Sequence, residues 1–129
     1  MTQPDVIEFM RTMLASQMAC PVRAGRAEPS DVPPFIVIEE AGSLRSMYLP
    51  VYLPFRIGMT CFGKTGREAS ELWRTTTDIL HGLGPLIEDG VGMYGAYDET
   101  GPQPRDQAET RWPARYGVIG VYLLDMTLT

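Results

Sequence analysis

Hydrophobic and polar positions alternate with two different periods along this chain, and the period changes between residues 62 and 66. In the stretch 47–62, "MYLPVYLPFRIGMTCF", the odd positions from Val51 to Cys61 are apolar and the even positions are mixed or polar. A period of two predicts a strand with one buried face. In the stretch 66–82, "GREASELWRTTTDILHG", apolar positions recur every 3.6 residues and predict a helix. Its buried stripe would hold Ala69, Leu72, Trp73, Thr76, Ile79, Leu80 and Leu83.

The remaining patterns predict one more helix and three more strands. The helix covers 5–18, with a capping box at Thr2 and Asp5 and a stop at Pro21. The later segments are a strand at 35–40, a turn at 41–43, a strand at 91–97, a polar loop at 98–113 and a final strand at 114–129. We therefore expect a single domain over residues 1–129. Its fold class is α+β, with a mostly antiparallel sheet of about four to five strands and two helices on one face.

Composition narrows the classes of protein to which this chain can belong. The chain has 129 residues, 44% of them hydrophobic and 21% charged, which is ordinary for one globular domain. No apolar run approaches the ~20 residues that span a bilayer, and the first residues lack the basic segment of a secretory signal. We therefore expect a protein of a reducing compartment, not associated with membranes. The net charge of −5 disfavours nonspecific binding to nucleic acid, because acidic proteins repel phosphate.

The segment "GMTCFGKT" at 58–65 matches the phosphate-binding pattern G-x-x-x-x-G-K-[ST]. A phosphate-binding loop must leave its strand and curl, but Met59 and Cys61 continue the alternation of the preceding strand. Thr65 and Glu68 have the spacing of a helix capping box, which explains the Lys64-Thr65 end. The Asp of "VYLLD", Asp125, is followed by more strand pattern, whereas a magnesium-binding Asp would end its strand. We interpret the motif as a strand followed by a helix cap.

The other reactive side chains predict no catalytic, cofactor-binding or metal site. Cys20 and Cys61 fit buried small hydrophobes, with a disulfide or metal pair as the alternative. His81, the only histidine, falls in the last turn of the second predicted helix. The carboxylates at Glu39, Glu40, Asp98, Glu99, Asp106 and Glu109 could act in acid–base chemistry, but charged strand ends and loops are usually only solvated. We expect that the protein is not an enzyme.

In the order of its elements, the chain resembles the tail terminator (tail completion) proteins of long-tailed, non-contractile bacteriophages. The resemblance rests on "VIEFMRTMLASQM", "PPFIVIEEAG", the strand–turn–helix "PVYLPFRIGMTCFGKTGREASELWRTTTDIL" and the C-terminal "GVGMYGAYDETGPQPRDQAETRWPARYGVIGVYL". It covers nearly the whole chain.

The resemblance implies a structural protein without active site, cofactor or metal. Such a protein forms a six-fold homo-oligomeric ring on the finished tail tube, stops tube polymerisation and joins the tail to the head connector or stopper protein. DNA would pass through the ring without specific binding. The ring would sit at the tail–neck junction of the virion after assembly in the cytoplasm of the bacterial host. Alternatives are a head-side connector or stopper component, and a small nucleotide-binding domain that uses residues 58–65.

Overall fold

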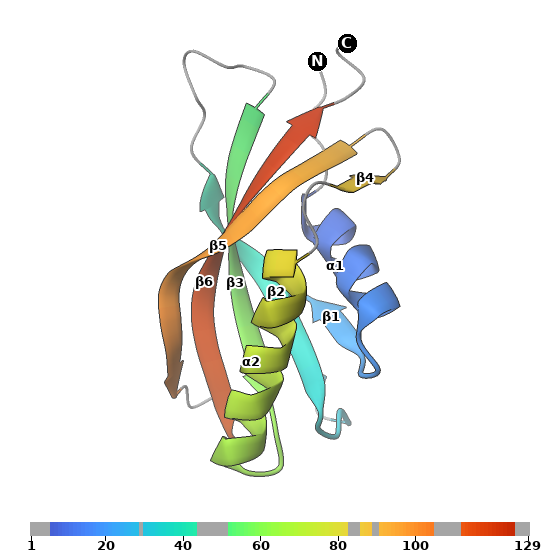
Figure 1. Cartoon of the computed structure of the whole chain (residues 1–129). Helices are drawn as coiled ribbons and strands as arrows, with labels where there is room; N and C mark the ends of the chain where they lie inside the picture. The colour runs from blue at the N-terminus through green and yellow to red at the C-terminus, as the bar shows by residue number, and fades with distance from the viewer. Residues whose placement is uncertain are drawn as a thin grey trace.

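The computed structural model describes residues 6–28, 30–43, 52–82, 86–88, 91–104 and 112–125 (Figure 1). The elements are α1 (Val6–Gln17), β1 (Val22–Ala24), β2 (Phe35–Ser43), β3 (Tyr52–Phe62), α2 (Gly66–Gly82), β4 (Leu86–Glu88), β5 (Val91–Pro104) and β6 (Ala114–Asp125). The strands form one six-stranded sheet in the order β1-β2-β3-β6-β5-β4. β1 runs parallel to β2, and the other neighbours are antiparallel. The sheet twists so strongly that β5 crosses from one side of Figure 1 to the other.

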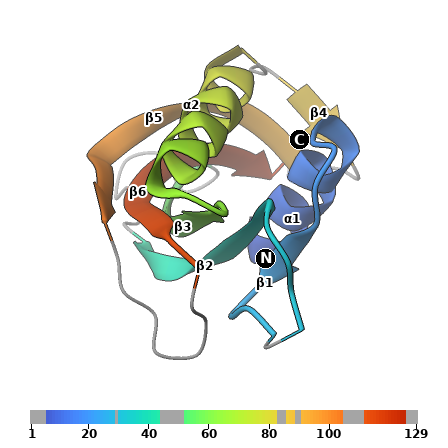
Figure 2. The same cartoon turned by 90° about the horizontal axis from the view of Figure 1, so that it is seen from below.

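Both helices pack on the same face of this sheet (Figure 2). α1 contributes Met10, Met13 and Leu14 to the main core, and α2 contributes Trp73 and Leu80. The residues that β2, β3 and β6 contribute to this core follow the period of two: Ile36, Ile38, Ile57, Met59, Cys61, Ile119 and Val121. The predicted α+β class with two helices on one face is confirmed, although the sheet is mixed and two three-residue strands, β1 and β4, increase the number of strands to six.

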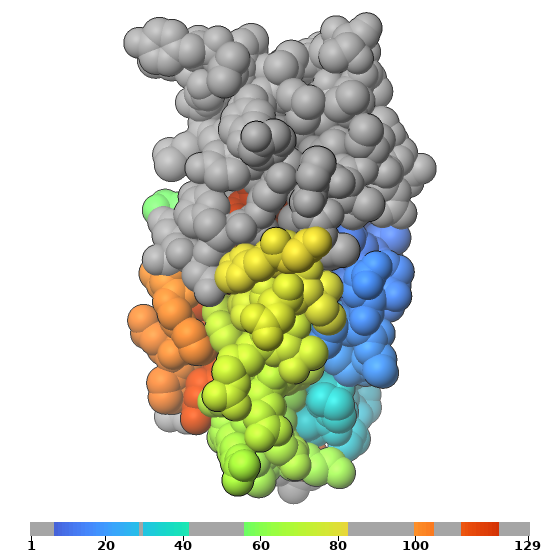
Figure 3. Space-filling view, in the orientation of Figure 1, coloured from blue at the N-terminus to red at the C-terminus, as the bar shows by residue number. Residues whose placement is uncertain are grey.

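α2 packs against the sheet through Trp73, which lies on the helical stripe that the sequence predicts. The indole is 2% exposed and lies directly over Gly117 of β6. A Cβ atom on Gly117 would lie 2.8 Å from Cζ2 of Trp73 and 2.7 Å from the carbonyl oxygen of Thr100, closer than real Cβ contacts. The missing side chain of Gly117 therefore lets the indole rest on the backbone of a central strand. Figure 3 shows α2 over the middle of this face, with α1 beside it.

The predicted polar loop over 98–113 is wrong in its first half, because residues 98–104 belong to β5. Register shifts follow Met93, Asp98 and Thr100, and they accommodate residues that a regular strand would reject. Thr100 accepts a hydrogen bond on Oγ1 from the amide of Val118 at 2.9 Å, so a side chain supplies a contact across the irregular part of the ladder. Residues 105–111, including Asp106 and Glu109, lie outside the described residues.

Other predicted boundaries are close to those of the structure. α2 covers the predicted residues, and α1 ends at Gln17, one residue before its predicted end. The turn predicted at 41–43 is wrong: these residues continue β2 after a bulge between Glu40 and Gly42. The predicted cap at Thr2 and Asp5, the strand residues 47–51 and 126–129, and the helix end at 83–85 lie outside the described residues.

Replacing Trp73 or Gly117 should disturb the same contact from its two sides. Trp73→Ala should lower the free energy of unfolding by about 3 to 5 kcal/mol, because it leaves a large cavity. Gly117→Ala should lower it by roughly 1 to 3 kcal/mol, because the new methyl group overlaps the indole. Gly101→Ala is a matched control in β5, since a Cβ there would meet no atom within 4 Å. Urea denaturation of the wild type and the three variants measures these differences.

The double variant Trp73→Ala/Gly117→Ala tests whether the two effects share one contact. The cavity left by removal of the indole should accommodate the methyl group added at position 117. The double variant should therefore lose less stability than the sum of the single losses. Strictly additive losses would mean that the indole and Gly117 do not constrain each other.

Candidate functional site

The motif-bearing segment at 58–65 is a strand followed by a helix cap, which confirms the interpretation from sequence. Gly58 to Phe62 lie in β3, paired on both sides with β2 and β6. The hydroxyl of Thr65 accepts a hydrogen bond from the amide of Glu68 at 3.2 Å. The carboxylate of Glu68 accepts one from the amide of Lys64 at 2.9 Å, one residue before the cap amide that a capping box predicts. Hydroxyl and carboxylate together satisfy amides at the start of α2.

Gly63 has a specific packing role in this turn. A Cβ on Gly63 would overlap the amide nitrogen of Ala69 and lie 2.8 Å from the carbonyl carbon of Glu68. The first turn of α2 therefore packs against the bare backbone of Gly63. The amide of Gly63 also donates to the carbonyl oxygen of Pro113 at 3.1 Å, which ties the turn to the start of β6. The contact with the first turn of α2 therefore explains why residue 63 of the motif is a glycine.

Asp125 lies at the opposite end of the sheet from Lys64 and Thr65. β6 is antiparallel to β3, with Ala114 opposite Phe62 and Leu124 opposite Tyr52. A strand of 12 residues spans about 36 Å, so Asp125 is too far away to share a metal ion with Thr65. In a nucleotide-binding fold, a parallel strand would bring its carboxyl end to the phosphate-binding loop. The continuation of the strand pattern past Asp125, at 126–129, lies outside the described residues.

The two cysteines are free thiols packed in or against the main core. Cys61 is fully buried, and burial raises the pKa of its thiol far above the ordinary value. The Thr76 side chain hydrogen-bonds with Cys61 and opposes that rise in pKa. Cys20 is half-buried, and desolvation raises its pKa too. Both thiols are therefore disfavoured as nucleophiles, and the interpretation as small hydrophobes is confirmed for Cys61.

The remaining candidate side chains are distributed over the fold. His81 is exposed in the last turn of α2, as predicted. Glu40 lies on β2 and Asp98 on β5, at the same level of the sheet, because Glu40 pairs with Ile57, Ile57 with Ile119, and Ile119 with Asp98. Three strand spacings separate their backbones, which is about 14 Å. The backbones of Glu40 and Asp98 are therefore separated by two intervening strands. Within the described residues, no group of three or more His, Cys, Asp and Glu is placed to hold a metal ion.

The sheet face opposite the helices has its own small core at one end. Phe35 and Phe62 stack there with ring centroids 4.4 Å apart and an interplanar angle of 12°. Ala27, Val37 and Ala114 complete the cluster, and Trp112 packs against it. The chain between β1 and β2 therefore covers this end of the face, where no helix lies among the described residues.

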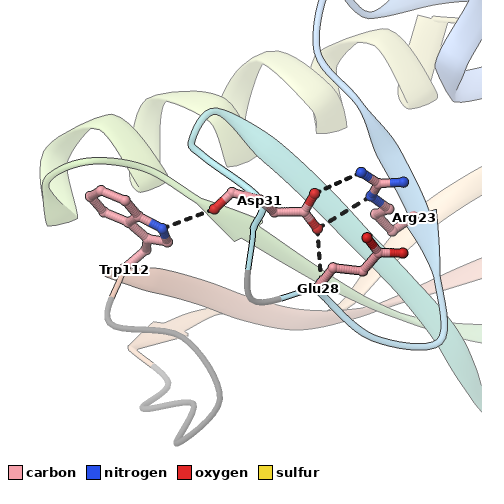
Figure 4. A network of polar contacts seen from close by, with 4 residues as sticks. All are labelled: Arg23, Glu28, Asp31 and Trp112. Atoms are coloured by element: carbon pink, nitrogen blue, oxygen red, sulfur yellow. Dashed lines mark hydrogen bonds and ion pairs between the residues drawn. The ribbon is translucent and has the colours of Figure 1, made fainter.

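A polar network holds that covering segment in place (Figure 4). Both carboxylate oxygens of Asp31 accept from Arg23, at 2.6 and 3.2 Å, and one also accepts from the amide of Glu28 at 2.9 Å. The indole of Trp112 donates to the carbonyl oxygen of Asp31 at 3.1 Å, which connects the segment to residues just before β6. The hydrogen bond from Arg23 lowers the pKa of Asp31 below its ordinary value.

The middle of the helix-free face is partly polar around Gly58. A Cβ on Gly58 would lie 3.1 Å from Cγ of Glu39 and 3.1 Å from the hydroxyl of Tyr116, so side chains from both neighbouring strands close over it. Arg56 and Thr60 carry the mixed polarity that could suit a subunit contact. Arg56 is half-buried, but Thr60 is only 2% exposed and cannot serve as a contact surface. The side chain of Tyr52, on the same alternating positions, lies outside what the structure describes.

The two outer strands of the sheet leave long stretches of backbone without a partner strand among the described residues. β1 pairs only with Ile36 to Ile38 of β2. Among the described residues, the rest of β2, at 39–43, therefore has only β3 as a neighbouring strand. β4 pairs only with Val91 to Met93 of β5, so the rest of β5 has only β6 beside it in the described part of the chain. Such edges are templates for pairing with another chain. These edges are candidate interaction surfaces in the part of the chain that the structure describes.

Comparisons with known proteins do not assign the chain to a family: neither a scan against protein-family models nor a search of curated proteins found a match. Neither of the two described helices has the length and apolar character needed to cross a membrane.

The strand-and-cap structure predicts that the chain does not bind ATP or GTP. Thr65→Ala should lower the free energy of unfolding by about 1 kcal/mol through the lost cap, and Lys64→Ala should leave it nearly unchanged because the Lys64 side chain is exposed. Calorimetric titration with nucleotide and magnesium, alongside thermal melts, measures both effects. Saturable, magnesium-dependent binding that Lys64→Ala abolishes would overturn the interpretation.

The Arg23–Asp31 pair predicts a pH-dependent contribution to stability. Because the folded-state pKa of Asp31 lies below its unfolded value of about 3.9, the contribution is present above that pH and is lost as pH falls through the folded pKa. Asp31→Asn should therefore destabilise the protein at pH 7, and the difference from wild type should shrink toward about pH 2. Denaturant titrations across this range measure it; a difference that does not change with pH would contradict the assignment.

Proposed function

We propose that this chain is a structural ring protein of a bacteriophage tail, a terminator that caps the tail tube. Copies of the chain close into a ring, six-fold in the family it resembles, at the junction of tail and neck. The ring stops polymerisation of the major tail tube protein and presents a surface to the head connector or stopper protein. It works by assembly, without catalysis, cofactor or metal.

The open edges of the sheet carry this proposal. A ring of identical subunits needs two different complementary surfaces, so that each copy binds the next through unlike patches. The edge of β2 beyond β1 and the edge of β5 beyond β4 are two such surfaces, and they lie on opposite sides of one sheet. The order of helices and strands also follows the order on which the resemblance to tail terminators rests.

The acidic charge of the chain is compatible with a ring through which DNA passes. The net charge is −5, and Lys64 is the only lysine. A basic lumen would grip the phosphates of the passing duplex, whereas an acidic one would let it slide. DNA is therefore cargo that moves through the ring without specific binding.

Two alternatives make different predictions for the same particle. A head-side connector or stopper component would act after tails are complete, so its loss would leave tails of normal length that fail to join heads. A nucleotide-binding domain at 58–65 would need a phosphate loop where the structure has strand and cap. The topology favours the ring protein over that second alternative.

Disruption of the gene in the phage or prophage that carries it tests the proposal. We expect overlong tubes without heads in negative-stain micrographs, since polymerisation of the tube would lack its stop. A plasmid copy of the wild-type gene should restore tails of uniform length. Headless tails of normal length would support the stopper alternative, and normal infectious particles would contradict a role in the tail.

A further inference from the structure

We propose that neighbouring copies join by extending the sheet: β2 of one copy, over 39–43, pairs antiparallel with β5 of the next copy, over 96–100. This inference rests on the proposed ring function and specifies its subunit joint. The partner is a second copy of this chain, and the recognition is backbone hydrogen bonding between strand edges, as in other cases of strand addition.

The two open segments lie at the same level of the sheet. The ladder connects Glu40 to Ile57, Ile57 to Ile119, and Ile119 to Asp98. It connects Ser43 in the same way, through Phe55 and Val121, to Ala96. A head-to-tail joint between segments at equal levels repeats with little shift along the strands. A small shift per copy favours a closed ring over an open helical filament.

The directions of the two strands also suit each other. β2, β3, β6 and β5 are neighbours in the sheet and alternate in direction, so β5 is antiparallel to β2. When β5 of one copy lies beside β2 of the next, the pair continues the same alternation across the joint. A two-fold contact between two β2 edges or two β5 edges would instead close as a dimer.

Pairing is restricted to this level because both edges are closed toward the Phe35–Phe62 end of the sheet. On the β2 side, β1 occupies the edge at Ile36 to Ile38. On the β5 side, Pro102 and Pro104 lack the N–H groups that a ladder requires, and such prolines are common on edges protected from pairing. The segments 39–43 and 96–100 have no second partner strand among the described residues, and each contains one register shift, between Glu40 and Gly42 and between Asp98 and Thr100.

The backbone of Glu40 points toward the open side of β2. The amide of Ile36 donates to the carbonyl oxygen of Pro21 at 3.0 Å, and the carbonyl of Ile38 accepts from Gly25 at 2.8 Å, so these residues direct their backbone groups outward. Residues two apart in a strand point the same way, and Glu40 is still in regular register opposite Ile57. Its N–H and C=O therefore face the position of a neighbouring strand.

Both edges carry acidic residues, and this affects how tightly the joint forms. Glu40 lies on β2 and Asp98 on β5, at the same level of the sheet. Like charges on facing strands weaken pairing. The joint should therefore tighten as salt screens the repulsion, which is the opposite of a joint held by ion pairs. Weak association at low salt would keep free copies apart until a tube end gathers them.

Two substitutions at Glu40 separate charge from backbone. Glu40→Thr removes the carboxylate and keeps the N–H, so association should equal or exceed that of wild type. Glu40→Pro removes the carboxylate and the outward N–H, so association should weaken about tenfold relative to Glu40→Thr. Circular dichroism and melting confirm that both variants fold, and sedimentation across protein and salt concentrations measures association. Restoration of tail length in the gene-disrupted phage provides the second readout.

A crosslinking experiment tests the joint without relying on proline. The double variant Glu40→Cys/Asp98→Cys is made in a Cys20→Ser background, since Cys61 is fully buried. A short bismaleimide should convert concentrated protein, and purified tails, into a ladder of dimers, trimers and larger species. The single variants should give no ladder.

The outcomes distinguish this joint from the ring itself. Equal association and equal restoration by Glu40→Pro and Glu40→Thr, with no ladder, would overturn the joint even if gene disruption gives overlong tails. Dimers from either single variant would show two-fold pairing and would also overturn it. Normal tails after gene disruption would refute the proposed function, and the ladder in purified protein would still decide the joint.

Discussion

The packing of the Trp73 indole against Gly117 is the contact on which the arrangement of the sheet and α2 depends. An indole that rests on bare backbone fixes the distance of the helix from the central strand β6. The carbonyl of Thr100 lies over the same glycine, so the irregular part of β5 is adjusted to the same point. One point of the core therefore joins α2, β6 and β5.

That packing leaves the outer strands incompletely covered among the described residues. β1 and β4 have three residues each, so they protect only parts of β2 and β5. Natural proteins commonly protect edges with charge, proline and bulges, and this sheet has all three. Here they are unevenly placed: the prolines and β1 protect one level, while acidic residues and two register shifts lie on the level that has no second partner strand among the described residues. A surface that associates weakly until it is gathered on a template suits a protein that must act only at the end of a finished tube.

Much of the fold could be predicted from the sequence because local and tertiary signals agree there. The change of period between β3 and α2, and the spacing of Thr65 and Glu68, identified strand, cap and helix correctly. The extension of β5 through Pro102 and Pro104 could not be predicted, because those residues are tolerated only on an edge with shifted register. β1 and β4 are too short to leave a pattern. The burial of Thr60 and the packing role of Gly63 could not be predicted either, because both depend on contacts with other elements. The edges of the sheet could not be predicted because they depend on the order of the strands.

If copies of this chain form a ring through one continuous sheet at the end of the tail tube, a cryo-electron microscopy reconstruction of the tail–neck region tests it most directly. We predict a closed ring at the tube end in which β2 of each copy runs antiparallel beside β5 of the next, at the level of Glu40 and Asp98. A ring whose copies meet through α1 and α2, with the β2 and β5 edges facing solvent, or the absence of the chain from that region, would contradict it.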